Sequence, residues 1–278
     1  MQINIPKLLA DHVSTQPGGV EWLQDLPRII GTLSQRWQLS LSEPFTEEVT
    51  GSWVAPCTSA YGEAVLKVGY PHFEATHEID GLRLIDGKCA IRLYESVKSC
   101  HALLLERCVP GTYLRGKSDS IQDEVICALL QELWQIPHDD QIRSLKTMIT
   151  RWAKSARNKF SDLTNRKDVV FHGIDTLEAL ANDRIQPVLL ATDLHAGNVL
   201  ASSRRPWLMI DPKPHIGDPC YDLTQHLLNT TARLDRSLIE SLSLKAEVDA
   251  ERVLRWTFGR LCLDQKNHAL AAKLANQL

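Results

Sequence analysis

The sequence lacks the features that would place the protein in several large classes. Its seven cysteines are scattered and include no C-x-x-C pair, so we expect no zinc site and reduced thiols in a cytoplasmic protein. No apolar run approaches the roughly 18 residues needed to span a bilayer. The first residues also lack a basic segment followed by a long apolar stretch, so neither a membrane partner nor a secretion signal is expected.

The chain also lacks a strong charge of either sign. Its formal net charge is -3, which gives no electrostatic reason to expect nucleic acid as a partner. This mild acidity is compatible with a small cationic substrate. With 278 residues, 44% hydrophobic and 23% charged, the chain is long enough for one large domain or two modest lobes with a substantial core.

The most informative stretch runs from Val188 to Leu223. Two short apolar runs within it suit buried strands, and the polar segment between them suits a hairpin turn. Asp193 follows the first run, Asn198 comes five positions later, and Asp211 ends the second run. Loops at strand ends hold polar groups on a rigid base, where catalytic groups are usually found.

The order Asp, Asn, Asp matches the needs of phosphoryl transfer. In protein kinases the first Asp orients the nucleophile, and the Asn and the later Asp hold Mg²⁺ on the ATP phosphates. A single Asp or Asn in a loop is more often a cap or a turn former. All three in this order, separated by hairpin-like sequence, are much harder to obtain by accident, so the pattern predicts a kinase-like centre.

The segments TDLHAGNVL and WLMIDPKPHIGDPCYDL resemble the aminoglycoside phosphotransferase family, most of all its streptomycin 6-phosphotransferase/hydroxyurea kinase branch. The resemblance covers about residues 45–265. It implies an α+β, bilobal protein-kinase-like fold with a small β-rich N-terminal lobe and a larger helical C-terminal lobe. The family motif is H-G-D-x-x-x-x-N, whereas this chain has Ala191 and Thr192 where His and Gly are expected. His195 is either a nearby substitute or an ordinary loop histidine.

The resemblance also assigns nucleotide-binding residues in the first lobe. Lys67 lies in the run AVLKV and resembles the lysine that pairs with the α and β phosphates of ATP; without that context it would be read as a solvated edge residue. Gly51 and Ser52 match the position of the phosphate-covering turn, although no complete G-x-G-x-x-G is present. Glu74 and Glu78 share one helix face, and we expect Glu78 to hold Lys67 toward ATP.

A hinge between the lobes is expected after two strands at 89–94 and 101–107. Its sequence, Glu106-Arg107-Cys108-Val109-Pro110-Gly111, resembles the family's interlobe segment, and adenine would bond to backbone groups around Glu106 to Cys108. We therefore place the N-terminal, ATP-covering lobe at 1–110. The C-terminal lobe, with the catalytic loop and the metal and substrate sites, is placed at 111–278.

Helical periodicity accounts for most of the remaining sequence. The basic residues between 143 and 159 are better read as a solvated helix face than as a nucleic-acid site, and Asp218 is expected to cap a helix. Helices are expected over 21–37, from about 71 or 72, over 119–135, from Asp140, over 169–181 and over 250–264.

The sequence thus predicts an ATP- and Mg²⁺-dependent O-phosphotransferase of a small hydroxylated substrate, with streptomycin-like aminoglycosides as the leading class. In this reading Asp193 accepts the proton of the attacking hydroxyl, Asn198 and Asp211 hold the metal, and Lys67 fixes the phosphates. The resemblance places the substrate pocket in the C-terminal helical region, where seven acids are candidate partners for cationic groups: Asp218, Asp222, Glu240, Glu247, Asp249, Glu251 and Asp264.

Two alternatives remain open. The first keeps the fold and changes the substrate to another small molecule, such as hydroxyurea, a sugar or an amino alcohol, because function depends on the pocket. The second is a nucleotide-binding kinase-like module with little activity, and Ala191 is the feature that supports it. The sequence does not reveal which hydroxyl is phosphorylated, whether GTP replaces ATP, or the oligomeric state.

Overall fold

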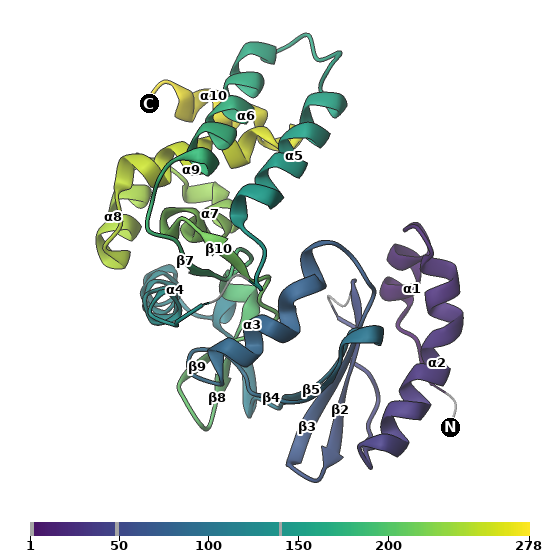
Figure 1. Cartoon of the computed structure of the whole chain (residues 1–278). Coiled ribbons are helices and arrows are strands. Elements are labelled where there is room, and N and C mark those ends of the chain that lie inside the picture. Colours follow the sequence, from purple (N-terminus) through teal and green to yellow (C-terminus); the bar gives the residue numbers. More distant parts are fainter. Residues whose placement is uncertain (1–2, 48–49, 139–140) are drawn as a thin grey trace. The chain divides into compact units, whose positions relative to one another are not determined.

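The computed structural model describes residues 3–47, 50–138 and 141–278. The chain divides into two compact units, Met1–Gly111 and Thr112–Leu278 (Figure 1). In the part of the chain that the structure describes, no helix is both long and apolar enough to cross a membrane.

The first unit is built on a five-stranded antiparallel sheet. The central hairpin pairs β2 with β3, and the turn at 60–61 is followed by Gly62 at φ +87°, a backbone conformation that glycine adopts without steric cost. In spatial order the strands are β1 (Ser40–Leu41), β2 (Ser52–Ser59), β3 (Gly62–Gly69), β5 (Ala102–Glu106) and β4 (Leu93–Val97).

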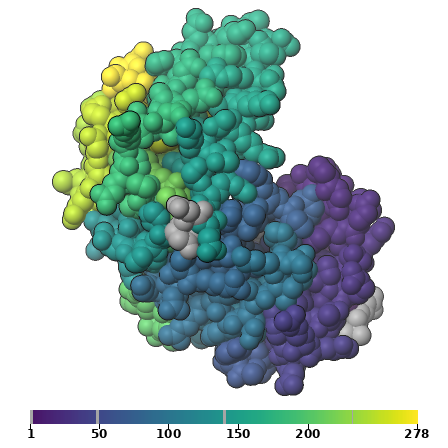
Figure 2. Space-filling model, in the orientation of Figure 1, coloured from purple at the N-terminus to yellow at the C-terminus, as the bar shows by residue number. Residues whose placement is uncertain are grey.

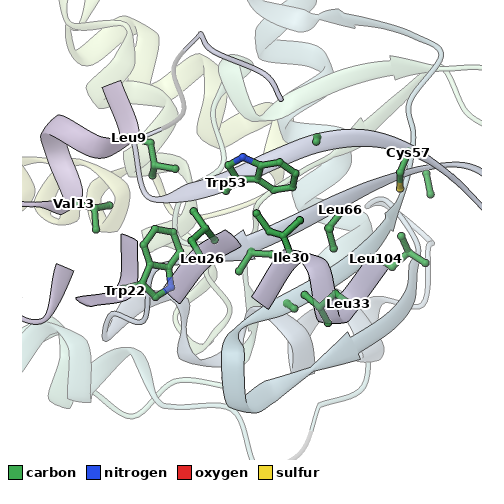
Figure 3. Packing of buried hydrophobic residues seen from close by; sticks show 14 residues of the cluster. Leu9, Val13, Trp22, Leu26, Ile30, Leu33, Trp53, Cys57, Leu66 and Leu104 are labelled. Atoms are coloured by element: carbon green, nitrogen blue, oxygen red, sulfur yellow. The ribbon is translucent and has the colours of Figure 1, made fainter. Parts of the chain in front are cut away.

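Two helices, α1 (Lys7–Val13) and α2 (Gly19–Arg36), cover one face of this sheet (Figure 1). The buried residues of α2 recur at helical spacing and pack on the sheet residues, as the close-up of Trp22, Leu26 and Ile30 beside Trp53 shows (Figure 3). The side chains of both helices form the purple surface in Figure 2. Pro27 lies well inside α2, on its exposed side, where water can replace the missing backbone hydrogen bond.

Two expectations for this unit need correction. The helix expected from residue 71 or 72 instead begins with a 3-10 turn, η1 (Glu74–His77), and continues as α3 (Glu78–Ile85). The strand expected at 89–94 is β4, shifted to Leu93–Val97. Its apolar first half, 89–91, is buried and forms only an isolated bridge at Ala90, because burial of a short apolar run does not require a continuous strand.

The second unit is mainly helical. The helix start expected at Asp140 lies outside the described residues. The helix in this segment begins at Leu145. The hydroxyl of the preceding Ser144 caps it by accepting a hydrogen bond from the Thr147 amide at 3.3 Å. The helices are α4 (Asp119–Trp134), α5 (Leu145–Lys159), α6 (Lys167–Asn182), α7 (Pro219–Asn229), α8 (Arg236–Ala246), α9 (Ala250–Cys262) and α10 (His268–Ala275).

Two small sheets carry the loops of the sequence stretch around Asp193. One pairs β7 (Val188–Leu190) with β10 (His215–Gly217) in antiparallel register. The other has the order β6-β8-β9, from β6 (Pro110–Tyr113), β8 (Val199–Ser202) and β9 (Trp207–Met209).

A buried ionic network fixes α7, which follows these sheets, against α4. The Oδ1 atom of Asp123, in α4, lies 2.7 Å from His226 Nε2. The Asp123 carboxylate also accepts hydrogen bonds from both terminal nitrogens of Arg233, at 2.9 and 2.7 Å. Burial raises the pKa of Asp123, but these hydrogen bonds outweigh burial and bring the pKa to about 2. The carboxylate is therefore charged at neutral pH, and it fixes the helix that also carries Asp222.

Candidate active site

Lys67 and Glu78 form a buried ion pair in the first unit. Along β3 the side chains alternate, so Leu66 and Val68 enter the core under α2 and Lys67 points to the opposite face. There its Nζ lies 2.6 Å from Oε1 of Glu78, the first residue of α3, and the two residues are only 6% and 4% exposed. Glu78, the glutamate expected from the sequence, thus pairs with this lysine.

Gly51 and Ser52 lie near Lys67 along the same hairpin. Ser52 opens β2 and pairs with Gly69, and the Gly51 carbonyl accepts from the Tyr70 amide at 2.9 Å. A Cβ placed on Gly51 would meet no atom within 4 Å, so the backbone here is open to approach. Residues 48–49, in the segment that leads into this turn, lie outside the described residues.

The segment expected to contact adenine begins where β5 ends. The Glu106 amide donates to the Arg92 carbonyl at 2.9 Å, and the Glu106 carboxylate accepts from the Arg92 amide at 3.0 Å. An adenine contact through the Glu106 amide would therefore displace Arg92. Cys108 is buried, and the chain then turns at Gly111, whose φ is +73°.

In the second unit the structure brings the loops of Asp193, Asn198 and Asp211 together. The side-chain amide of Asn198 donates to the main-chain carbonyl of Asp193 at 2.9 Å. The main-chain carbonyl of Asn198 accepts from the Ile210 amide at 2.8 Å, which places Asn198 beside the residue that precedes Asp211. The β8–β9 register, with Val199 opposite Met209, fixes this arrangement.

Two non-glycine residues in these loops have a left-handed backbone. Thr192 has φ +52° and Asp211 has φ +50°. This conformation is uncommon for residues with a side chain and is a clear outlier for a β-branched one. Such backbone strain persists only where the surrounding structure enforces the conformation, and strained residues are most frequent at functional sites.

The carboxylate of Asp222 supplies that enforcement for the loop before Asp193. This fully buried group on α7 accepts from the amides of Ala191 at 3.0 Å and Thr192 at 2.7 Å, and from the indole of Trp134 at 3.1 Å. Asp222 therefore supports the loop before Asp193. His195 lies in the same loop, and its Nδ1 accepts a hydrogen bond from the nearby Gly197 amide at 3.1 Å.

Burial of Asp222 has a consequence for stability. Loss of water around the carboxylate raises its pKa to about 6, although the N–H groups of Ala191, Thr192 and Trp134 favour the charged form. Because the folded pKa lies above the ordinary value of 3.8, the stabilisation of the protonated form is fully present below about pH 4 and is lost as pH rises through about 6.

We predict that Asp222→Asn removes this pH dependence and lowers the free energy of unfolding by about 1–3 kcal/mol, because an amide nitrogen would face a loop N–H. Denaturant unfolding at pH 4, 5.5 and 7 checks it: the advantage of the unmutated protein should be largest at pH 4. Asp235→Asn, at the exposed N-cap of α8, is the control and should show no such trend. An advantage that grows with pH would contradict the assignment.

The donor set in this unit fits a magnesium ion. Asp211 accepts the ammonium of Lys213 at 2.6 Å, which shows that its carboxylate is placed to receive a cation. The nitrogen of the Asn198 amide is bonded to Asp193, so its oxygen faces the other way. Among the described residues, no group of three or more His, Cys, Asp or Glu forms a metal site. Mg²⁺ does not require one, because it uses one or two carboxylates with waters and substrate phosphates.

Six of the seven acids considered as substrate partners are engaged within the unit. Each would have to exchange a protein partner for a substrate amine. Asp218 and Asp222 accept side-chain and backbone donors, Asp249 and Asp264 cap helices, and Glu240 and Glu251 pair with Arg236.

Sequence reasoning missed the residues that support the loops. The Thr192 hydroxyl donates to the Lys213 carbonyl at 2.6 Å, and the Lys213 amide donates to the Ala191 carbonyl at 2.9 Å. The Trp134 bond to Asp222 was also missed. Only the position of Lys213, two residues after Asp211, offered a signal in the sequence.

Comparisons with known proteins identify the family of this chain. Residues 36–269 match the aminoglycoside/hydroxyurea antibiotic resistance kinase family. Hydroxyurea phosphotransferase of Kitasatospora aureofaciens is 32% identical over 272 residues, covering 93% of this chain and 78% of that protein. Streptomycin 6-kinase of Streptomyces griseus is 29% identical over 279 residues, covering 93% of this chain and 89% of that protein.

Solved structures agree in fold. Choline kinase LicA from Streptococcus pneumoniae superposes with a TM-score of 0.68 at 14% identity, over 91% of this chain and 99% of that one. A thermostable mutant of aminoglycoside phosphotransferase APH(4)-Ia, in complex with AMP-PNP and hygromycin B, superposes with a TM-score of 0.62 at 15% identity. The match covers 89% of this chain and 96% of that one. The family branch and the fold predicted from the sequence are thereby confirmed. The chain belongs to the aminoglycoside/hydroxyurea antibiotic resistance kinase family, with an α+β protein-kinase-like fold, and is a phosphotransferase with an alcohol group as acceptor.

Proposed function

We propose that this protein transfers the γ-phosphoryl group of ATP, with Mg²⁺, to a hydroxyl group of a small molecule. The observation that carries the proposal is the grouping of Asp193, Asn198 and Asp211 on neighbouring loops, of which Asp222 anchors the one that leads to Asp193. This is the order of residues that phosphoryl transfer uses in kinases.

Asp193 would orient the attacking hydroxyl and accept its proton. Asn198 and Asp211 would hold Mg²⁺, which when bound neutralises negative charge on the phosphates. Catalysis by these residues would be positioning and electrostatic stabilisation, with no covalent enzyme intermediate.

The first unit would bind the nucleotide. Lys67 would pair with the α and β phosphates, and Glu78, at 2.6 Å from its ammonium, would fix the direction of that side chain. The open backbone at Gly51 and Ser52 would let N–H groups approach the phosphates. Backbone groups from Glu106 to Cys108 would contact adenine, and a contact through the Glu106 amide would replace its bond to Arg92.

Streptomycin-like aminoglycosides are the leading substrate class, since two relatives are named streptomycin 6-kinase. Hydroxyurea, the substrate named for the third relative, is the second candidate. One observation favours this smaller, uncharged molecule: most of the acids considered for binding ammonium or guanidinium groups already have partners inside the protein.

The proposal of a catalytically weak module rested on Ala191. The Asp193 loop is nevertheless anchored, because Asp222 binds the amides of Ala191 and Thr192 and the Thr192 hydroxyl bonds to Lys213. These contacts use the main chain of residue 191 and do not depend on its side chain. They favour an enzyme with turnover.

A coupled assay of ADP release tests the function. Streptomycin, other aminoglycosides, hydroxyurea and sugars would each be added to the protein with Mg-ATP. We expect ADP release above the substrate-free rate with streptomycin or hydroxyurea, and none when EDTA replaces Mg²⁺. Mg-ATP that raises the melting temperature while every compound gives only background ADP would support the binding module and reject the proposal.

A further inference from the structure

The carboxylate of Asp211 is already paired with a cation of its own chain. The ammonium of Lys213 lies 2.6 Å from Asp211 Oδ1, and the two side chains are 15% and 37% exposed. Both an ammonium and a magnesium ion bind carboxylate oxygens through their positive charge, and two cations in contact with one carboxylate repel each other. Lys213 and a metal would therefore compete for Asp211.

The backbone of Lys213 is held in place on both sides. Its amide donates to the Ala191 carbonyl at 2.9 Å, and its carbonyl accepts from the Thr192 hydroxyl at 2.6 Å. His215 Nδ1 also lies 3.0 Å from that carbonyl. The ammonium can therefore leave Asp211 only by rotation of the lysine side chain, since these bonds keep the main chain in register with the Asp193 loop.

Among the described residues, Asp211 is the one carboxylate that forms an ion pair with Lys213. In the absence of a ligand, an ammonium that leaves Asp211 loses its ion pair. A bound nucleotide changes this balance, because its phosphates supply both further ligands for Mg²⁺ and a new anionic partner for the lysine.

We propose that Lys213 is a positioning residue that acts as the resident counter-ion of Asp211 and competes with Mg²⁺ until the nucleotide arrives. The inference rests on the proposed function, because it takes Asp211 as a metal ligand. It implies that the free enzyme binds divalent metal weakly and that metal and nucleotide bind cooperatively. If Lys213 only held the Asp211 side chain in position for the metal, its removal would lower the metal affinity. Under the competition proposed here, its removal raises that affinity.

Electron paramagnetic resonance with Mn²⁺ as the probe tests this in the absence of nucleotide. Lys213→Met should bind Mn²⁺ about three- to tenfold more tightly than the unmutated protein, the range that a partly exposed ion pair gives. Lys213→Arg, which keeps the charge, should bind as weakly as the unmutated protein. With AMP-PNP present the difference between Lys213→Met and the unmutated protein should shrink.

The chain offers a matched control. Lys266 and Asp264 form another pair two residues apart, at 3.2 Å and more exposed, so Lys266→Met should leave Mn²⁺ binding unchanged. Far-UV circular dichroism and denaturant unfolding check the fold, which should persist because the hydrogen bonds at residue 213 are made by its main chain.

Equal or weaker Mn²⁺ binding by Lys213→Met would overturn the counter-ion role while leaving the proposed function intact, provided that Mn²⁺ binds in the presence of AMP-PNP. Absence of Mn²⁺ binding in every protein, even with AMP-PNP, would overturn the proposed function and the counter-ion role together.

Discussion

Replacing Asp193 by Asn is expected to lower kcat by about 10²–10⁴-fold, the range for loss of a positioned proton acceptor. The Asn side chain has nearly the same shape but cannot take the proton of the attacking hydroxyl. The hydrogen bond from Asn198 should survive, because it goes to the main-chain carbonyl of residue 193. Binding of Mg-AMP-PNP, measured by calorimetry, should therefore remain close to that of the unmutated protein.

Asp249→Asn is the matched control for this change. Asp249 caps α9 through the Arg252 amide at 2.8 Å, and Asn is an equally good cap, so turnover should be unaffected. If Asp193→Asn lost nucleotide binding and kept most of its rate, the catalytic base would have been assigned to the wrong residue.

Lys67→Met is expected to lower the free energy of unfolding by about 3–5 kcal/mol, because it leaves the buried Glu78 carboxylate without its partner. It should also weaken ATP binding, since the ammonium proposed to meet the phosphates is gone. Urea unfolding and calorimetric titration with AMP-PNP measure the two effects separately.

The double variant Lys67→Met/Glu78→Met separates stability from function. Replacing both members of a buried ion pair by apolar side chains is often neutral, so most of the lost stability should return. Nucleotide affinity should stay low. Recovery of affinity along with stability would mean that Lys67 serves the fold alone.

The parts of the site that the sequence predicted are encoded over short distances along the chain. Asp193, Asn198 and Asp211 fall within one strand–loop–hairpin unit, whose strand register brings Asn198 beside Ile210. The pairing of Lys67 with Glu78 spans 11 residues. In such units the local pattern of strands and turns already decides which residues meet.

The parts that could not be predicted depend on contacts between distant segments. Trp134 reaches Asp222 across 88 residues of sequence, and Asp222 reaches Thr192 across 30. Nothing in local periodicity indicates that these side chains meet. The loop that carries Ala191 in place of the motif histidine is anchored through its main chain, by a contact that the local sequence does not indicate.

The shift of β4 has a similar cause. Residues 89–91 have the apolar composition of a strand and are buried, but of these three only Ala90 forms a bridge, and the strand begins at Leu93. A short apolar run in the sequence predicts that the segment is buried. It does not distinguish a buried strand from a buried loop of the same length.

The most direct test of phosphoryl transfer follows the γ-phosphate of ATP by ³¹P NMR in the presence of Mg²⁺ and either streptomycin or hydroxyurea. We predict a new resonance of a phosphorylated product that grows at the rate at which ADP forms, with Asp193→Asn giving neither. A γ-phosphate that remains on ATP, or that appears only as inorganic phosphate, with every compound of the substrate panel would contradict the assignment of Asp193, Asn198 and Asp211 as a phosphotransferase centre.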